Sequence, residues 1–489
     1  MSASEGASTF SNRWGMLLVM LGMAVGTGNI WRFPRIAATN GGGTFLIPWA
    51  IFLLAWSIPL LLIEFAMGKA ARRGPIGAFA TLIGESWAWM GAWVALCATF
   101  IMFYYSVVTG WCLRYLAAAA AGELPGAAPG ALWESYAGSG WAVLTMGLSV
   151  AIAIWVVARG VRGIEQAARF MMPILLVLVV VLAIRAVTLP GAVRGLAFLF
   201  TPDLAGLGNS RIWLEALTQN AWDTGAGWGL ALTYAIYMRA REDTTVNAFV
   251  LGFGNNSVSL LAGIMVLCTV FSIRPDASAE IVGAGNTGLT FIWIPQLFAA
   301  MPAGRLFMAA FFLALFFAAM TSLISMVELA TRVLVDRGIA RGKAIAWVAV
   351  AALAFGVPSA LSMGFFENQD NVWGVGLLVS GLFFGVAILK FGVDRFRRQL
   401  VNSEGSDIAI GRWWNGAVWL VVVEALVLLA WWLSQTLSRE GWAESLDPFV
   451  PWSLGTILLQ FAIVLVLCVA FNRRLARLAA VAGPAGDAS

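Results

Sequence analysis

Two glycine-rich runs, GTGN at residues 26–29 and GAGWG at residues 225–229, lie inside long apolar stretches of the chain. Glycine weakens a helix, so a helix that contains such a run is expected to unwind there. Unwound carbonyl groups can replace the water shell of a cation, and the amino end of the following half-helix offers N–H groups to an anion. The runs therefore favour binding of a small ion and a charged solute. The alternative is that they only allow close helix packing.

Histidine is absent from the sequence, which excludes the Ser-His-Asp and Cys-His catalytic sets, the HExxH zinc helix and His-ligated haem. The four cysteines, Cys97, Cys112, Cys268 and Cys468, lie in apolar stretches without CxxC spacing. We interpret them as small buried hydrophobic residues. We therefore expect no enzyme and no metal or redox centre of these kinds.

Membrane-spanning helices must position the two glycine runs. Of the 489 residues 61% are hydrophobic and only 11% are charged, whereas a water-soluble surface needs roughly a quarter of its residues charged. A helical span takes about 20 apolar residues. We therefore predict an all-α membrane protein whose residues 1–489 form a single domain with twelve transmembrane helices, at approximately 14–37, 43–68, 88–120, 140–158, 167–189, 211–238, 245–273, 302–335, 344–364, 372–393, 413–436 and 449–472.

Lys and Arg residues concentrate in alternate connections between these spans, for example Arg72, Arg73, Arg397 and Arg398. Positively charged short loops remain on the cytoplasmic side of a membrane. We therefore predict a multi-pass protein of the plasma membrane or cell inner membrane, with both termini in the cytoplasm. This topology also accounts for the net charge of +5 without a nucleic-acid partner.

The two glycine runs fall in the first and the sixth predicted span, and each of these spans opens a set of five. Interrupted helices at corresponding positions of two halves are typical of inverted repeats that enclose a binding site near the middle of the membrane. We therefore predict repeat one at 14–190 (spans one to five), repeat two at 211–398 (spans six to ten) and two accessory spans within 413–472.

The run GTGNIWRFP at residues 26–34, followed by NGGG at 40–43 and IPLLLIE at 58–64, resembles the opening of the neurotransmitter:sodium symporter family. The resemblance continues through YY at 104–105, LTY at 232–234 and FFAAMTS at 316–322, and it covers the chain from about 14 to 475. It implies a leucine-transporter-like fold with unwound first and sixth helices. It also implies sodium-driven uptake of amino acids or their derivatives by alternating access.

The resemblance implies two sodium sites made of oxygen ligands, as a hard cation requires. The first would use Ala24, Asn29, Asp223 and Asn255. The second would use the carbonyls of Gly22, Val25 and Ala318 and the hydroxyls of Thr321 and Ser322. In the alternative interpretation, the two hydroxyls only bond back to carbonyls of their own helix.

Asp223 departs from the family pattern, which usually places Thr or Ser at this position. Chloride-dependent members bind chloride between that hydroxyl, a tyrosine of span two and the residues at Gln219, Asn255 and Ser259. This chain has Trp49 where the tyrosine is expected. We predict that the Asp223 carboxylate supplies the negative charge and also binds sodium, so that chloride is not required. The competing hypothesis is a protonated Asp223, which would allow proton coupling.

The family's substrate pocket implies a larger set of contacts. Gly26 stands where monoamine carriers place an aspartate, so the resemblance favours a substrate with its own carboxylate, held by span-one amides and the Tyr105 hydroxyl. Trp222 and Trp228 could close over a side chain or cage a methylated ammonium. The predicted contacts are Met23, Ala24, Gly26, Thr27, Gly28, Ile101, Tyr105, Trp222, Asp223, Gly225, Trp228, Ser322 and Met326.

Gate residues are also implied by the resemblance. Arg32 would form the outer gate with Asp370 or Asn371. Tyr237 and Asp336 match inner-gate positions, but their usual arginine partner before span one is missing, so either Arg13 substitutes for it or the gate is weak. Glu64, an acid within an apolar run, is expected to hydrogen-bond an unwound segment.

These observations predict a sodium-coupled symporter for an amino acid or related small zwitterion, with two Na⁺ per cycle, in a lipid bilayer, as a monomer or dimer. One alternative is uptake of a betaine-like compatible solute, which the tryptophans favour. Another is a sodium-conducting channel or a non-transporting sensor on the same fold.

Overall fold

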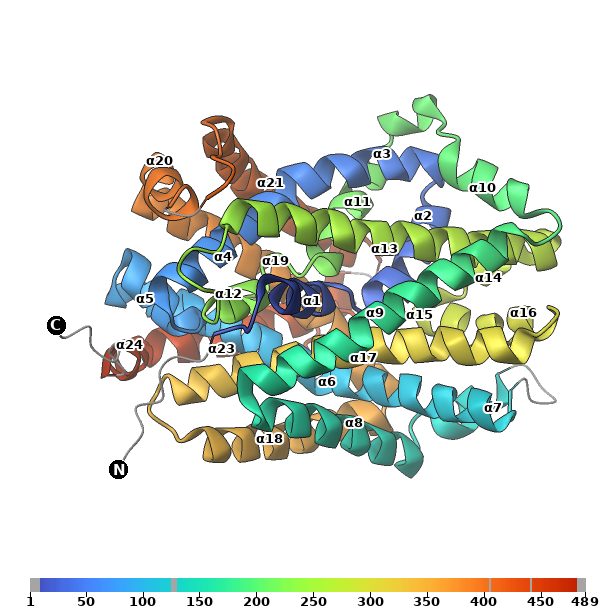
Figure 1. The fold of residues 1–489 in the computed structure, drawn as a ribbon, viewed down its shortest axis with the longest axis horizontal. Helices are drawn as coiled ribbons and strands as arrows, with labels where there is room; N and C mark the ends of the chain where they lie inside the picture. The colour runs from blue at the N-terminus through green and yellow to red at the C-terminus, as the bar shows by residue number, and fades with distance from the viewer. Residues whose placement is uncertain (1–8, 125–129, 404–405, 440–441, 482–489) are drawn as a thin grey trace.

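The computed structural model describes residues 9–124, 130–403, 406–439 and 442–481, and all of its regular elements in these ranges are helices (Figure 1). Among the described residues, nine helices are long and apolar enough to cross a membrane, and a bent pair makes ten. The nine are Gly43–Ala71, Glu85–Ala121, Gly140–Ala158 (α8), Gly160–Val187 (α9), Thr244–Ile273 (α13), Gly304–Val335 (α17), Arg341–Leu361 (α18), Met363–Phe391 (α19) and Trp413–Leu437 within α21 (Trp413–Arg439). The first of them contains α3 (Gly43–Phe52) and α4 (Ile58–Ala71), and the second contains α6 (Ala88–Ala121).

Two of the twelve predicted spans are shorter in the structure than a full crossing. The stretch predicted at 211–238 forms α11 (Ser210–Asp223) and α12 (Leu230–Ala235), separated by non-helical residues. The stretch predicted at 449–472 forms α23 (Leu454–Ala470). The nine long helices and the bent pair correspond to the other ten predicted spans. The prediction of twelve spans is therefore matched at ten positions, and the remaining two stay predictions.

Some helices begin earlier than their apolar stretch. Helix α9 begins at Gly160 instead of residue 167, and α19 begins at Met363 instead of residue 372. Charged and amide residues such as Glu165 and Gln369 lower the hydropathy of these first turns without disfavouring helix. Hydropathy therefore marks the apolar part of each helix and misses its polar start.

The first break separates α1 (Arg13–Ala24) from a π-helical turn (Gly28–Arg32) and α2 (Phe33–Thr39), and the chain bends there by 52°. Gly26 lies in the bend, and its N–H donates to Asn29 Oδ1 at 2.8 Å. The π-helical turn runs directly into α2, so Gly28–Thr39 is one continuous helix that contains Pro34 near the junction. The sequence thus both interrupts the helix and restarts it.

The second break runs from Thr224 to Gly229 between α11 and α12. Gly225, Gly227 and Gly229 have φ values of +68°, +87° and +78°. Residues other than glycine rarely adopt this left-handed backbone conformation. The three alternate glycines therefore allow a backbone path that would be strained with most other residues. Two separate half-helices therefore point into the centre of the bundle.

Short helices cover the two ends of the bundle (Figure 1). One end has α5 (Pro75–Ile83), α20 (Val393–Phe396) and α24 (Asn472–Val481). The other has α7 (Ala131–Tyr136), α10 (Ala192–Phe200), α14 (Ser278–Gly283), α15 (Gly285–Thr287) and α16 (Ile294–Ala299). The outer faces of the long helices expose large apolar side chains such as Phe170, Val177 and Trp419. Such a surface suits lipid rather than water.

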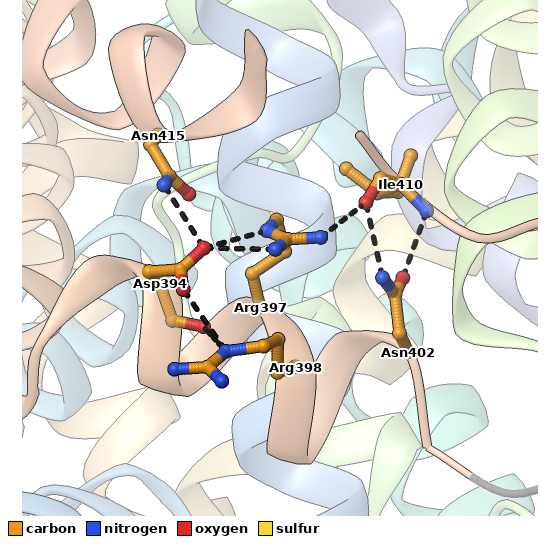
Figure 2. Close-up of polar contacts among 6 residues, drawn as sticks. All are labelled: Asp394, Arg397, Arg398, Asn402, Ile410 and Asn415. Carbon is orange, nitrogen blue, oxygen red and sulfur yellow. Dashed lines mark hydrogen bonds and ion pairs between the residues drawn. The ribbon is translucent and has the colours of Figure 1, made fainter. Parts of the chain in front are cut away.

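A polar cluster ties the end of α20 to the start of α21 (Figure 2). Asp394 forms ion pairs with Arg397 at 2.8 Å and with Arg398 at 2.9 Å, and it accepts a hydrogen bond from Asn415. Arg397 also donates to the Ile410 carbonyl at 2.8 Å. These hydrogen bonds and guanidinium groups lower the pKa of Asp394 to about 2. Because this pKa lies below the ordinary value for aspartate, the charged Asp394 stabilises the folded protein fully at neutral pH. This contribution is lost as the pH falls through the lowered pKa of about 2.

Candidate functional site

The two breaks face a common cavity of about 500 Å³ near the middle of the bundle. Residues from both broken helices, α6, α17 and α19 line it. Every residue predicted to contact substrate lies on its wall: Met23, Ala24, Gly26, Thr27, Gly28, Ile101, Tyr105, Trp222, Asp223, Gly225, Trp228, Ser322 and Met326. Residues as far apart in sequence as Met23 and Met326 are thus brought to one space.

The residues predicted for the first sodium site form a hydrogen-bonded group beside the first break. Asn29 Nδ2 donates to Asn255 Oδ1 and to Ser259 Oγ, both at 2.8 Å. Asn255 Oδ1 also lies 3.2 Å from the Ala24 carbonyl oxygen and 3.0 Å from that of Asp223. Oxygens this close repel one another unless a cation lies among them or the Asn255 amide turns to donate from Nδ2. The donor set therefore fits a hard monovalent cation.

Asp223 is buried at the end of α11, where its Oδ2 accepts a hydrogen bond of 2.6 Å from Ser259. Its Oδ1 is buried without a hydrogen-bond donor among the described residues. A side chain at Gly28 would come within 3.2 Å of this oxygen, so Oδ1 points at the first break. A buried carboxylate oxygen without a donor is costly, and a bound cation would remove that cost.

The residues predicted for the second sodium site lie where α1 meets α17. A side chain on Gly22 would come within 3.1 Å of Thr321 Cβ, so the two helices touch there. The Thr321 hydroxyl donates within its own helix, to Phe317 at 2.9 Å and Ala318 at 3.1 Å. Ser322 Oγ instead donates across to the Met23 carbonyl at 3.4 Å. Val25 is buried directly after α1. One hydroxyl thus bonds its own helix and the other bridges the helices.

Tyr105 of α6 and Ser322 of α17 lie next to the first break. The Tyr105 hydroxyl accepts hydrogen bonds from the Thr27 N–H and the Thr27 hydroxyl, both at 3.2 Å. A phenol that accepts twice keeps its own proton free to donate. A side chain at Gly26 would lie 3.0 Å from Ser322 Oγ and 3.1 Å from Tyr105 Oη. Glycine at 26 therefore keeps these two hydroxyls accessible to a ligand.

The two tryptophans of the second break form one wall of the cavity. Their rings meet edge to face, with centroids 6.4 Å apart. Trp228 Nε1 donates to the Ala221 carbonyl at 3.2 Å, which fixes that ring. Trp222 packs against Gly374 of α19, where any side chain would collide with the indole. The wall is therefore apolar and firmly held.

Arg32 does not pair with its predicted outer-gate partners. It donates to Gln219 Oε1 at 3.0 Å, and its guanidinium lies 5.3 Å from the Trp222 ring centroid. Asp370 and Asn371 line the same cavity, but within the described ranges no ion pair joins Asp370 to Arg32. An amide oxygen and an indole face satisfy the guanidinium in this conformation.

The inner-gate residues also have partners that differ from the expectation. Asp336 pairs with Arg332 one helical turn earlier, at 2.6 Å, and accepts a 2.6 Å hydrogen bond from the Gly74 N–H. Burial raises the pKa of Asp336, and Arg332 opposes that rise. Arg13 is exposed at the start of α1 and is not part of this ion pair.

Glu328 is a buried acid that contacts the predicted inner-gate residue Tyr237 and that the sequence reasoning missed. It is fully buried on α17, accepts a 2.5 Å hydrogen bond from Tyr237 and forms a 2.6 Å ion pair with Arg341. The signal was present, because Glu328 is an acid in an apolar run, as Glu64 is. A second missed group is Glu165, which accepts hydrogen bonds from Ser11 just before α1.

Glu64 lies against the second break. Its Oε1 accepts from the Gly227 N–H at 2.6 Å and its Oε2 accepts from the Leu232 N–H at 3.0 Å. Both donors are amide groups that the interruption leaves without a helical partner. The carboxylate thus replaces the backbone acceptors that the broken helix has lost.

Comparison with known proteins places this arrangement in a family. The model of the sodium:neurotransmitter symporter family matches residues 7–140 and 134–479. An uncharacterised sodium-dependent transporter of Methanocaldococcus jannaschii is 32% identical over 86% of this chain and 90% of its own length. One of Bacillus subtilis is 33% identical over 86% and 96%. The crystal structure of MhsT in complex with L-phenylalanine superposes with a TM-score of 0.77 at 28% identity, over 87% of this chain and 99% of MhsT. The chain therefore belongs to the sodium:neurotransmitter symporter family, as a sodium-dependent transporter and not an enzyme.

Proposed function

We propose that this protein is a symporter that couples the entry of sodium to the uptake of an amino acid, by alternating access and without a need for chloride. The observation that carries the proposal is the meeting of both helix breaks at one cavity, beside a cluster of oxygen atoms. One of these atoms, Asp223 Oδ1, is buried without a hydrogen-bond donor among the described residues. In this proposal repeats 14–190 and 211–398 move relative to each other, and both termini lie in the cytoplasm.

Asp223 is the basis for proposing chloride independence. Its carboxylate occupies the place where a chloride ion would otherwise balance the charge of sodium, and it is held by Ser259 at 2.6 Å. A fixed negative charge next to a buried cation lowers the cation's energy without a second ion. A protonated Asp223 is the competing state, in which sodium binding releases a proton and transport is coupled to a proton gradient.

The first break and Tyr105 support a substrate that carries its own carboxylate. The Tyr105 hydroxyl has a proton free to donate. The Gly26 and Thr27 N–H groups donate to Asn29 and Tyr105 in this conformation, so in this proposal the substrate carboxylate replaces those acceptors. Arg32 adds positive charge on the side of the cavity that Trp222 lines. The molecule in the MhsT complex, L-phenylalanine, carries such a carboxylate. The indoles of Trp222 and Trp228 then pack against its side chain.

Uptake into proteoliposomes tests the proposal. Radiolabelled neutral amino acids and glycine betaine are offered under an inward gradient of Na⁺ or K⁺, with external chloride or gluconate. We expect saturable accumulation of an amino acid with Na⁺ alone, unchanged in gluconate. Accumulation of betaine only would support the compatible-solute alternative. Sodium current without accumulation would indicate a channel, and binding without uptake a sensor.

Replacing Tyr105 by phenylalanine tests the carboxylate contact. The variant loses one hydrogen bond to a charged group, which is worth about 1.5–3 kcal/mol. We therefore expect the substrate Kd to rise about tenfold to a hundredfold, at 1.4 kcal/mol per tenfold. Isothermal titration in saturating Na⁺ measures it, with Tyr115→Phe on the same helix as the control. Equal affinities for wild type and Tyr105→Phe would contradict the assigned contact.

A further inference from the structure

A second cavity of about 480 Å³ lies between α6, α17, α18 and α23, and it shares no lining residue with the central one. It is located toward the end of the molecule that has α5 and α24, since Ile76 and Leu475 line it. Most of its lining is aliphatic or aromatic, including Met102, Trp347 and Phe471. Trp347 and Phe471 are also strongly exposed on the outer face of the bundle. The cavity is thus a groove open toward the lipid.

Two polar side chains line this groove, and only one of them is satisfied. The Thr99 hydroxyl donates to the Ala95 carbonyl of its own helix at 2.7 Å. Arg337 follows α17, and its Nε is buried without a hydrogen-bond acceptor among the described residues. The neighbouring acid, Asp336, is already bound to Arg332 and to the Gly74 N–H. The groove therefore ends at a guanidinium whose charge has no ion-pair partner within the described ranges.

A second positive charge lies close to Arg337. Burial, and then the like charge of Arg474 on α24, lowers the pKa of Arg337. Arg474 directly precedes Leu475, which lines the groove beside Arg337. Two guanidinium groups of like charge at this end of an apolar groove form a place where an anion is stabilised. Inorganic phosphate could pair with these charges, but the apolar side chains of the groove would then have no bound molecule to pack against.

We propose that this groove binds an acidic phospholipid, with an acyl chain against α6, α18 and α23 and the phosphate at Arg337 and Arg474. Charge complementarity favours an anionic headgroup over a zwitterionic one. The position agrees with the leaflet that the Lys and Arg distribution assigns to the cytoplasm, where basic pockets between spans bind acidic lipids. Because α6 and α17 also contribute Tyr105 and Ser322 to the central cavity, the lipid packs against helices that build the substrate site.

Native mass spectrometry of the full-length protein tests this inference. The protein is released from detergent in the presence of equimolar palmitoyl-oleoyl phosphatidylglycerol and phosphatidylcholine, and bound lipids are counted. Four variants are compared: Arg337→Gln, Arg474→Gln, the groove-filling Ala351→Trp, and Arg241→Gln. The last removes an exposed arginine between α12 and α13, outside the groove, and is the matched charge control.

We expect wild type and Arg241→Gln to prefer phosphatidylglycerol about tenfold. Arg337→Gln should lose that preference, Arg474→Gln should lose part of it, and Ala351→Trp should lose binding of both lipids. Thermal unfolding checks that each variant is folded. An equal loss in Arg241→Gln and Arg337→Gln would overturn the proposal, because the effect would then be diffuse charge. The proposal would also be overturned if inorganic phosphate raised the unfolding temperature of wild type as much as phosphatidylglycerol does. It would be overturned too if wild type bound phosphatidylglycerol and phosphatidylcholine equally.

Discussion

Asp223→Ser is expected to abolish sodium-driven uptake in gluconate and to recover part of it in chloride. The wild-type carboxylate has one oxygen bound to Ser259 and the other without a donor beside the first break. Removing one partner of a buried charge pair costs about 3–5 kcal/mol. At 1.4 kcal/mol per tenfold, sodium affinity should fall by a factor of 100 or more. The serine leaves room in which a chloride ion can restore the charge.

Asp223→Asn is the matched control for this prediction. It keeps the size and one oxygen of the side chain but removes the charge, and it leaves no room for an anion. We expect it to be inactive in both gluconate and chloride. Uptake rates measured at several Na⁺ concentrations separate affinity from capacity. If Asp223→Ser transported as well as wild type in gluconate, Asp223 would not supply the charge.

Glu64→Gln is expected to destabilise the folded protein and to stop transport. The carboxylate accepts from the Gly227 and Leu232 N–H groups. A glutamine has one acceptor oxygen and an NH₂ group, so one buried N–H would face another donor. The loss of a charged acceptor and the unpaired amide together cost about 3 kcal/mol or more. Thermal unfolding in detergent should show a lower midpoint, with uptake lost in proteoliposomes.

Glu123→Gln provides the comparison for Glu64. Glu123 forms an ion pair with Arg114, but its side chain is half exposed. Such surface pairs contribute about 0–1 kcal/mol, so this variant should unfold and transport like wild type. A Glu64→Gln protein with an unchanged unfolding midpoint would contradict the role of the carboxylate as an acceptor for the broken helix.

The contacts of Arg32 in this conformation could not be predicted from residue spacing alone, and its gate role stays a prediction. Arg32 was expected to reach Asp370 or Asn371, but its guanidinium contacts Gln219 and the Trp222 ring. These contacts depend on how α11 turns relative to the first break, and the sequence does not specify that rotation. The α17 acid Glu328 was missed for a different reason. Like Glu64 it is a single acid in a long apolar run, but only Glu64 lies in a motif that carried the family resemblance, IPLLLIE at 58–64.

The sequence by itself determined the helical membrane architecture, the positions of both breaks and the residues around the central cavity. Apolar length and glycine content indicated the architecture and the breaks, because a bilayer selects these local properties strongly. The residues around the cavity came from the resemblance of motifs such as GTGNIWRFP at 26–34 to a known family. Only the tertiary structure decided which donors face Asp223 and Arg32, where the α17 acids pair, and that a second groove ends at Arg337. These features depend on the rotation and tilt of packed helices, which arise from contacts between residues distant in the chain.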